Sequence, residues 1–317
     1  MKTNLTILSS SVLATSIGLI ATSVGAQNLF VGTVDGTTIT EIAPTGTQTT
    51  FAPAVSLANG LAFNGSGNLF EADEASGYIN EFTPSGAEST FATGINRPAG
   101  LAFNSAGDLF VASYFGGSIY EFTPNGVQST FATGLNYPFA LAFNSAGNLF
   151  VASPVNGSII ELTPQGAQST FASGLSEITS LAFDGSGNLF ETEYNYGQSG
   201  FINKFTPSGA ESTFASGFDR PASLAFSSAG ILFEGNYGSG IINEFTPSGA
   251  ESTFVTGLGN ITGMAFQGIT LPVPEPSSIG SLVGVLAVGV SAISLFRRSS
   301  HSGTGSTPSL NGHGDED

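Results

Sequence analysis

Short apolar runs and turn residues recur at a fixed interval along residues 28–266. Each copy is marked by a Leu-Phe pair, at Leu29-Phe30, Leu69-Phe70, Leu109-Phe110, Leu149-Phe150, Leu189-Phe190 and Leu232-Phe233. The first four steps are 40 residues long, and the last is 43 because Tyr194–Ser199 enlarges one loop. Six copies at this period predict a closed array of small sheets.

Each copy contains four short runs that are rich in aromatic and β-branched residues and bounded by turn residues, which is typical of strands. In the third copy the runs are Asp108–Ser113, Ser118–Thr123, Gln128–Ala132 and Ala140–Phe143. In the middle runs, apolar residues occupy both odd and even positions, which indicates strands buried on both faces. Four antiparallel strands per copy make one blade. The sequence therefore predicts an all-β fold, a six-bladed β-propeller over residues 27–268.

Two kinds of tight turn recur with the strands. Thr123-Pro124-Asn125-Gly126 carries Pro and Gly at the positions that a type I turn prefers, and the same proline slot holds Pro44, Pro84, Pro124, Pro164, Pro207 and Pro247. Asn144–Gly147 forms the second turn, in which Gly supplies a positive φ. All these turns are expected on one face of the propeller, and the longer loops on the other.

The phase of the repeat predicts how the ring closes. The first copy begins at the second strand of a blade, so its innermost strand is missing at the N-terminal end. Ile261–Phe266, at the far end of the repeats, is the run that supplies it. We therefore expect the first blade to be built from both ends of the domain.

The N-terminal residues 1–26 are expected to be a secretory signal peptide. Met1-Lys2 precedes an apolar run, Leu5–Ala21, and Val24-Gly25-Ala26 offers small residues before a cleavage site near Gln27. The alternative is an anchor helix that is not cleaved.

The C-terminal residues 269–298 carry a second signal. Pro274-Glu275-Pro276 precedes the apolar run 279–296, which is long enough to span a bilayer core as a helix, and Arg297 and Arg298 follow it. This order resembles the PEP-CTERM sorting signal of Gram-negative bacteria. The resemblance implies processing by an exosortase-type protease and export to the cell surface or extracellular matrix, where exopolysaccharide or surface proteins are partners.

The tail 299–317 is polar and rich in Gly and Ser, and we expect it to be disordered. It is longer than such a sorting signal usually allows, which leaves a plain membrane anchor with a cytoplasmic tail as the alternative. In either case the membrane is contacted only through the C-terminal helix.

Charge excludes some partners. The net charge is −17 at pH 7, and within residues 27–272 the 19 acidic residues face only Arg97, Lys204 and Arg220. Such a surface repels nucleic acid phosphates and anionic lipids. The chain has no cysteine, and its two histidines, His301 and His313, lie in the tail. Disulfides, cysteine nucleophiles and zinc sites of cysteine or histidine are therefore excluded from the propeller.

The pattern at Pro98–Ala112, Pro-Ala-Gly-Leu-Ala-Phe-Asn-Ser-Ala-Gly-Asp-Leu-Phe-Val-Ala, resembles NHL repeats and the senescence-marker-protein/gluconolactonase superfamily of six-bladed propellers. The latter resemblance implies a divalent metal, often Ca²⁺, over the central channel, held by oxygen ligands just before the innermost strands. The matching positions are Asn59, Ala99, Phe139, Thr179, Ala222 and Thr262. Only Asn59 fits, so no cofactor is expected, although Ca²⁺ with Asn59, Asp73 and Glu74 stays an alternative.

Two sets of acidic residues recur in the copies. Glu71, Glu191 and Glu234 follow Leu-Phe where the other copies have Val, with Asp73, Glu74 and Glu193 close by. We expect them to be solvated loop charges with ordinary pKa values; the alternative is a cation site or a shared proton. The second set, Glu41, Glu81, Glu121, Glu161 and Glu244 with Lys204 in the sixth copy, is expected to be structural rather than an acidic ring.

The loop face gathers the residues best suited to bind a ligand. Its candidates are Asn59, Arg97, Tyr114, Phe115, Tyr137, Phe139, Tyr194, Tyr196, Arg220 and Tyr237. Aromatic rings beside hydroxyl and amide groups suit sugars or peptides, although rim packing between blades would also account for them. The sequence contains no motif for nucleotide phosphates and no Ser/His/Asp set.

These observations predict an exported, non-catalytic propeller that binds carbohydrate or protein through its loop face. The alternatives are a Ca²⁺-dependent lactone or ester hydrolase of gluconolactonase type and a rigid spacer in a surface layer.

Overall fold

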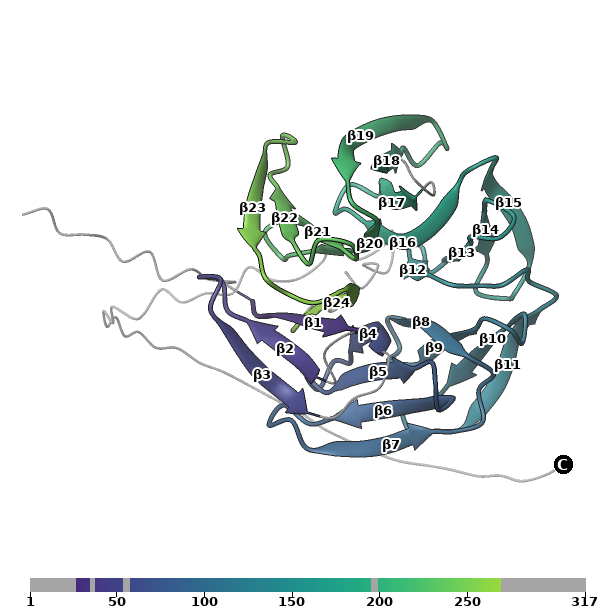
Figure 1. Cartoon of the computed structure of the whole chain (residues 1–317). Helices are drawn as coiled ribbons and strands as arrows, with labels where there is room; N and C mark the ends of the chain where they lie inside the picture. Colours follow the sequence, from purple (N-terminus) through teal and green to yellow (C-terminus); the bar gives the residue numbers. More distant parts are fainter. Residues whose placement is uncertain (1–26, 35–37, 54–57, 195–198, 269–317) are drawn as a thin grey trace, which may run out of the picture. The chain divides into compact units, whose positions relative to one another are not determined.

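The computed structural model describes residues 27–34, 38–53, 58–194 and 199–268. Within these residues it contains six four-stranded antiparallel sheets, which Figure 1 shows arranged around a common axis. From the axis outward, blade 1 is β24 (Ile261–Phe266), β1 (Leu29–Thr33), β2 (Thr38–Ile42) and β3 (Gln48–Pro53); blade 2 is β4 (Ala58–Phe63), β5 (Leu69–Asp73), β6 (Tyr78–Phe82) and β7 (Glu88–Ala92); blade 3 is β8 (Pro98–Phe103), β9 (Leu109–Ser113), β10 (Ser118–Phe122) and β11 (Gln128–Thr133).

The other three blades repeat this order. Blade 4 is β12 (Leu141–Phe143), β13 (Leu149–Ser153), β14 (Ser158–Leu162) and β15 (Gln168–Ser173); blade 5 is β16 (Glu177–Phe183), β17 (Leu189–Tyr194), β18 (Gly200–Phe205) and β19 (Glu211–Phe218); blade 6 is β20 (Pro221–Phe226), β21 (Leu232–Asn236), β22 (Ile242–Phe245) and β23 (Glu251–Val255). The six-bladed, all-β prediction is confirmed.

Strand ends differ from the sequence prediction by one residue. Asp108 lies outside β9 because its N–H donates to Asn104 Oδ1 at 2.8 Å and completes the preceding turn. Thr123 lies outside β10, where its N–H begins the next turn by donating to Val127 O. Ala140 precedes the three-residue β12, although its carbonyl still accepts from Ala152.

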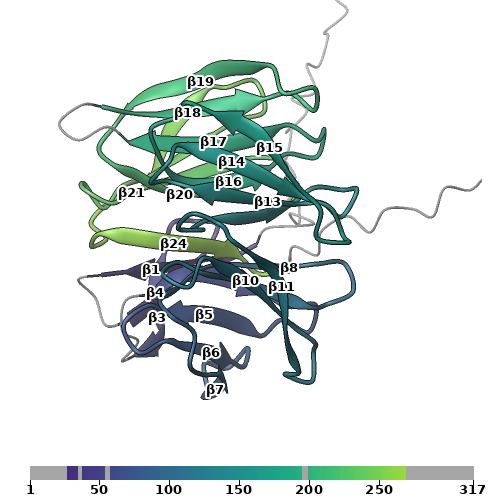
Figure 2. The ribbon, with the colours of Figure 1, turned by 90° about the vertical axis from the view of Figure 1, so that its right-hand side faces the viewer.

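The ring closes through the two ends of the domain, as predicted. β24 pairs with β1, with Leu29 opposite Phe266 and Val31 opposite Met264. Figure 2 shows β24, in yellow-green, beside β1, in purple. The six innermost strands also contact one another around the axis, β24 with both β4 and β20. The first and last strands of the propeller therefore pair with each other in blade 1.

A repeated set of three phenylalanines joins neighbouring blades. Phe110 on β9 lies edge-to-face against Phe131 of its own blade at 4.9 Å between ring centroids, and against Phe143 of blade 4 at 5.0 Å. The same contacts recur at every blade boundary, and Phe233 with Phe266 completes the ring between blades 6 and 1. Edge-to-face pairs are a favoured aromatic geometry.

The second strand of each blade is buried on both faces, as its composition predicts. All five residues of β9 are buried, whereas Gln128, Ser129 and Thr130 on the outer strand β11 are exposed. A register shift between Ile119 and Tyr120 marks a bulge next to that outer strand. Polar side chains and bulges both protect an exposed sheet edge from pairing with another chain.

The predicted terminal signals, 1–26 and 269–298 with the helix 279–296, and the tail 299–317, lie outside the described residues. Pro274, Glu275, Pro276, Arg297 and Arg298 are among them. Among the residues that are described, no helix is long and apolar enough to cross a membrane.

Candidate functional site

The six channel positions named from the family resemblance do come together. Asn59, Ala99, Phe139, Thr179, Ala222 and Thr262 all line a space at the centre of the propeller. Thr179 donates to Pro221 O at 2.7 Å, and Thr262 donates to the Gly32 carbonyl at 3.2 Å. Both hydroxyl groups therefore link strands, and Asn59 is the only one of the six with an amide or carboxylate side chain.

The other two residues of the suggested Ca²⁺ set have protein partners. The backbone N–H groups of Ala75 and Ser76 donate to Asp73 Oδ1, at 3.0 and 3.1 Å, so this carboxylate closes a turn. Glu74 accepts from Asn59 and from Arg97. Within the ranges that the structure describes, no group of three or more Asp, Glu, His or Cys side chains could hold a metal ion.

A cavity of about 190 Å³ opens on the loop face beside the channel. It is lined by Asn59, Glu74, Arg97, Ala99, Tyr114, Phe139, Pro154, Val155, Glu177, Ile178 and Thr179. Five of these were candidates from the sequence. Glu177 was missed because the equivalent positions of the other copies carry no carboxylate. These positions hold Arg97, Tyr137 and Arg220 in blades 3, 4 and 6. This variation at one repeated slot was the available signal.

One wall of the cavity is a closed polar network. Glu74 Oε1 pairs with the Nε of Arg97, and Glu74 Oε2 accepts from the Asn59 amide. The Arg97 side chain is 41% exposed and that of Glu74 only 16%. The Arg97 guanidinium also lies over the rings of Tyr114 and Phe115, at 5.1 and 4.7 Å from their centroids. Its charge is thus balanced and its position fixed from both sides.

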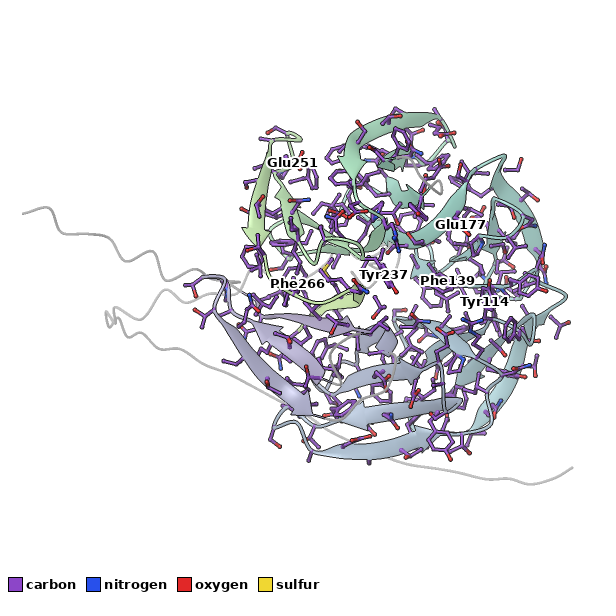
Figure 3. All side chains as sticks on the ribbon, viewed as in Figure 1. Tyr114, Phe139, Glu177, Tyr237, Glu251 and Phe266 are labelled. Atoms are coloured by element: carbon purple, nitrogen blue, oxygen red, sulfur yellow. The ribbon has the colours of Figure 1, made fainter. Side chains whose placement is uncertain are left out.

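Aromatic side chains form the neighbouring wall. Tyr114 contacts Phe115 and Tyr137, each at 5.2 Å between centroids, and Phe139 at 6.0 Å. Figure 3 shows Tyr114, Phe139 and Glu177 in the same part of the ring. Burial raises the pKa of Tyr114, and Arg97 opposes this shift, so its phenol is a neutral hydrogen-bond donor at neutral pH. Phe139 and Tyr114 thus offer apolar faces beside polar groups.

The backbone places Phe139 close to the channel. Phe139 O accepts from Gly100 N at 2.7 Å, and a Cβ at Gly100 would lie 2.3 Å from that oxygen. Only glycine allows this approach of neighbouring innermost strands.

A second aromatic cluster lies on the loops of blades 5 and 6. The Arg220 guanidinium is 5.6 Å from the ring centroid of Tyr237 and 5.9 Å from that of Tyr194. Tyr237 N donates to Arg220 O at 2.8 Å, as Tyr114 N does to Arg97 O at 3.0 Å. The two clusters therefore share one backbone arrangement. Tyr196, the remaining candidate, lies outside the described residues.

Within the described ranges, three non-glycine residues have a positive φ: Arg97 at 58°, Tyr137 at 51° and Arg220 at 55°. Each stands directly before a proline, and Pro98 and Pro221 begin the innermost strands β8 and β20. Side chains other than glycine adopt this left-handed conformation at a cost of about 1 kcal/mol or more, and such residues cluster at functional sites. Their shared position supports the loop face as the functional face.

The strained backbone at Arg220 predicts the relative stability of two variants. Arg220→Gly and Arg220→Ala remove the same ring contacts, but only glycine adopts the positive φ freely. We expect the glycine variant to be more stable by about 0.5–1 kcal/mol, the reverse of the usual order. Thermal and urea unfolding of both variants would measure the difference; an alanine variant of equal or greater stability would contradict the strain.

The prediction of solvated charges at Glu71, Glu191 and Glu234 is wrong. All three lie within strands, on β5, β17 and β21, and each has an exposed fraction of 0%. Burial raises the pKa of each to about 8, and the hydrogen bonds that they accept from asparagines, two in the case of Glu234, oppose the shift only in part. Desolvation disfavours the charged form, so these side chains are neutral carboxylic acids at pH 7.

Each buried glutamate pairs with an asparagine on the next strand. Asn80, Asn203 and Asn243 donate to Glu71, Glu191 and Glu234 at 3.0, 2.8 and 3.1 Å, and the other glutamate oxygen has no partner. Where the glutamate is Val, the cross-strand residue is Thr40, Tyr120 or Ile160. This joint change across the copies was the sequence signal for a buried pair.

The structural interpretation of the other acidic set is supported by its contacts. Asn68 donates to Glu81 at 2.7 Å and Asn148 donates to Glu161 at 2.6 Å, each within one blade. Lys204, in the same slot of blade 5, lies over the Phe190 ring at 5.3 Å.

The opposite face holds more than the predicted tight turns. Its end of the channel is an apolar cavity of about 340 Å³, lined mainly by the Leu-Ala-Phe segments of the innermost strands, such as Phe103, Phe143 and Phe266.

No family model and no curated protein matches this sequence. Solved structures do resemble it in fold. One is from the Nidogen/Laminin complex, with a TM-score of 0.66, 16% identity, and coverage of 77% of this chain and 98% of that one. A virginiamycin B lyase from Staphylococcus aureus with Quinupristin has a TM-score of 0.58 and 16% identity, and the match covers 77% of this chain and 94% of that one. A gluconolactonase from Xanthomonas campestris has a TM-score of 0.58 and 16% identity, and the match covers 65% of this chain and 78% of that one.

These identities are low, so the similarity shows the shared six-bladed propeller fold. The fold part of the resemblance found in the sequence is thereby confirmed, and the comparisons leave the activity of this chain open.

Proposed function

We propose that this protein is an exported propeller of the cell surface or extracellular matrix that binds carbohydrate or protein through its loop face, without catalysis. The observation that carries the proposal is the loop-face cavity, where apolar rings of Tyr114 and Phe139 stand beside the Asn59–Glu74–Arg97 network. A concave site with aromatic walls and a few fixed polar groups is typical of ligand pockets. Two of the fold neighbours were solved in complexes, one in a Nidogen/Laminin complex and one with Quinupristin.

The test is a glycan array and a pull-down with surface proteins, using the purified protein and two matched variants. Phe115→Ala removes a ring that is 55% exposed on the loop face, where it contacts Tyr114 and Arg97 of the cavity wall, whereas Val127→Ala removes a side chain of similar exposure, 65%, from the opposite face. We expect binding to fall about tenfold or more in the first variant, since a stacked aromatic contributes about 1–3 kcal/mol, and to be unchanged in the second. Equal affinities of both variants would refute the loop face as the binding surface.

Export and processing form the second part of the proposal, because the order of Pro274-Glu275-Pro276, apolar run and Arg297-Arg298 supports them. The exosortase-type protease would then be a processing partner.

A Ca²⁺-dependent lactone or ester hydrolase is the alternative, and the fold likeness to a gluconolactonase supports it. In this alternative, Glu74 would release Arg97 and bind the Ca²⁺ ion together with Asn59. The melting temperature measured at increasing Ca²⁺ concentration decides between the two proposals. A ligand at a hundred times its Kd adds about 2.7 kcal/mol to the free energy of unfolding. A clear rise at millimolar Ca²⁺ would favour the hydrolase.

A further inference from the structure

The cavity contains one carboxylate that nothing in the described chain neutralises. Glu177 begins β16, lines the cavity and is half-buried, yet its side chain makes no hydrogen bond or ion pair with described residues. The neighbouring acid, Glu193, differs because Ser176 N donates to its Oε1 at 3.1 Å. A ligand is therefore the available partner for Glu177.

Each cation of the described chain already has a partner other than Glu177. Arg97 is paired with Glu74, Lys204 lies over Phe190, and Arg220 lies over Tyr194 and Tyr237. The polar wall at Glu74 and Arg97 is neutral as a unit, so Glu177 gives the cavity a net negative charge. The negative faces of Tyr114 and Phe139 add to the attraction for a positive group.

The rest of the lining favours a sugar over a lysine side chain. A lysine needs only the carboxylate and an aromatic face, but Asn59 and Arg97 also line the cavity, and their side chains carry an amide carbonyl and further N–H donors. These groups suit ring hydroxyls, and an aromatic side chain suits the apolar face of a sugar ring. A volume of about 190 Å³ is below the usual range for drug-sized ligands, so the cavity fits a single sugar unit.

We propose that this cavity binds a sugar unit with a free amine, with its ammonium group against the Glu177 carboxylate and its ring beside Tyr114 and Phe139. The inference rests on the proposed binding function and gives its ligand class: an amino sugar of a polysaccharide. The charge of the whole chain, −17, strengthens the attraction but does not select the site.

The test uses three oligosaccharides that share one backbone and differ in one substituent: chitosan oligosaccharide with an amine, chitin oligosaccharide with an acetamide, and cello-oligosaccharide with a hydroxyl. Calorimetry at mildly acidic pH and physiological salt measures the affinities. We expect the amine form to bind about tenfold or more tightly than the others, which is the order of one charge-assisted hydrogen bond.

Two variants of equal net charge separate the site from general attraction. Glu177→Gln should abolish the preference for the amine, whereas Glu251→Gln, on the exposed outer strand β23, should keep it (Figure 3). Glu177 makes no hydrogen bond, so its variant should melt like the parent protein. Equal losses in both variants, or a preference that survives Glu177→Gln, would overturn the proposal.

The outcomes also separate this inference from the proposed function. Binding of all three sugars without preference, or tighter binding of a lysine-rich peptide, overturns the amino-sugar inference and leaves a binding role for the loop face. Absence of binding by every sugar, peptide and surface protein overturns both.

Discussion

Raising the pH from about 4.5 to about 8 is expected to destabilise the folded protein by several kcal/mol. Glu71, Glu191 and Glu234 have a folded-state pKa of about 8 against an ordinary value of 4.5. Between these values the folded state holds more protons than the unfolded chain, so the free energy of unfolding falls as the pH rises. Each site contributes a slope of about 1.4 kcal/mol per pH unit. Their stabilising contribution is complete below pH 4.5 and is lost as the pH rises through 8.

The matched variants are Glu71→Gln and Glu211→Gln. Glutamine copies the neutral acid: its carbonyl can accept from Asn80, and its amide occupies the place of the unpartnered Oε1. Urea unfolding at several pH values gives the slope of the unfolding free energy against pH. In Glu71→Gln this slope should be smaller by the contribution of one titrating group, and the variant should be more stable than the parent at pH 8 by about 1–3 kcal/mol. Glu211 is exposed on β19, and its charge is the weakest of the causes that raise the pKa of Glu191, so its variant should keep a slope close to that of the parent. A parent whose stability does not change over this range would contradict neutral buried glutamates.

Removal of β24 is expected to abolish cooperative folding. A chain that ends at Asn260 leaves β1 without its inner partner and loses the buried side chains of Ile261, Met264 and Phe266. Deleting each of these buried side chains costs about 2–5 kcal/mol, and the three together are comparable to the usual 5–15 kcal/mol of total stability. Circular dichroism melting and protease digestion would measure the loss.

Two controls accompany this truncation. A chain that ends at Gly268 retains β24 and should melt cooperatively. A permuted chain that carries residues 261–268 before Gln27 restores the strand beside β1 and should fold. A soluble, cooperatively melting chain that ends at Asn260 would show that the closure is dispensable.

Much of the fold was predictable because it depends on local chemistry repeated six times. Gly126 and Gly147 have the positive φ that their turns require, at 78° and 82°. The pairing of β24 with β1 followed from the phase of the repeat alone. The strand ends were less certain, since side chains such as Asn104 compete with the ladder for backbone hydrogen bonds.

The candidate site was predictable only in part. The loop face, its aromatic residues and the six channel positions followed from where the turns and loops stand in each copy. The pairing of Glu74 with both Asn59 and Arg97 did not follow, because Asn59 lies on β4, Glu74 follows β5 and Arg97 precedes β8, so the three side chains meet only in the folded structure.

The sequence by itself determined the repeat, the number of blades, the closure and the face on which the variable residues lie, because each depends on residue type at a fixed spacing. Only the tertiary structure decided which acids are neutral and buried, which are paired, and which one is left for a ligand. Glu71, Glu74 and Glu177 are chemically identical in the sequence. Their different states follow from blade packing, which removes water from the first, places Arg97 beside the second and leaves the third facing an open cavity.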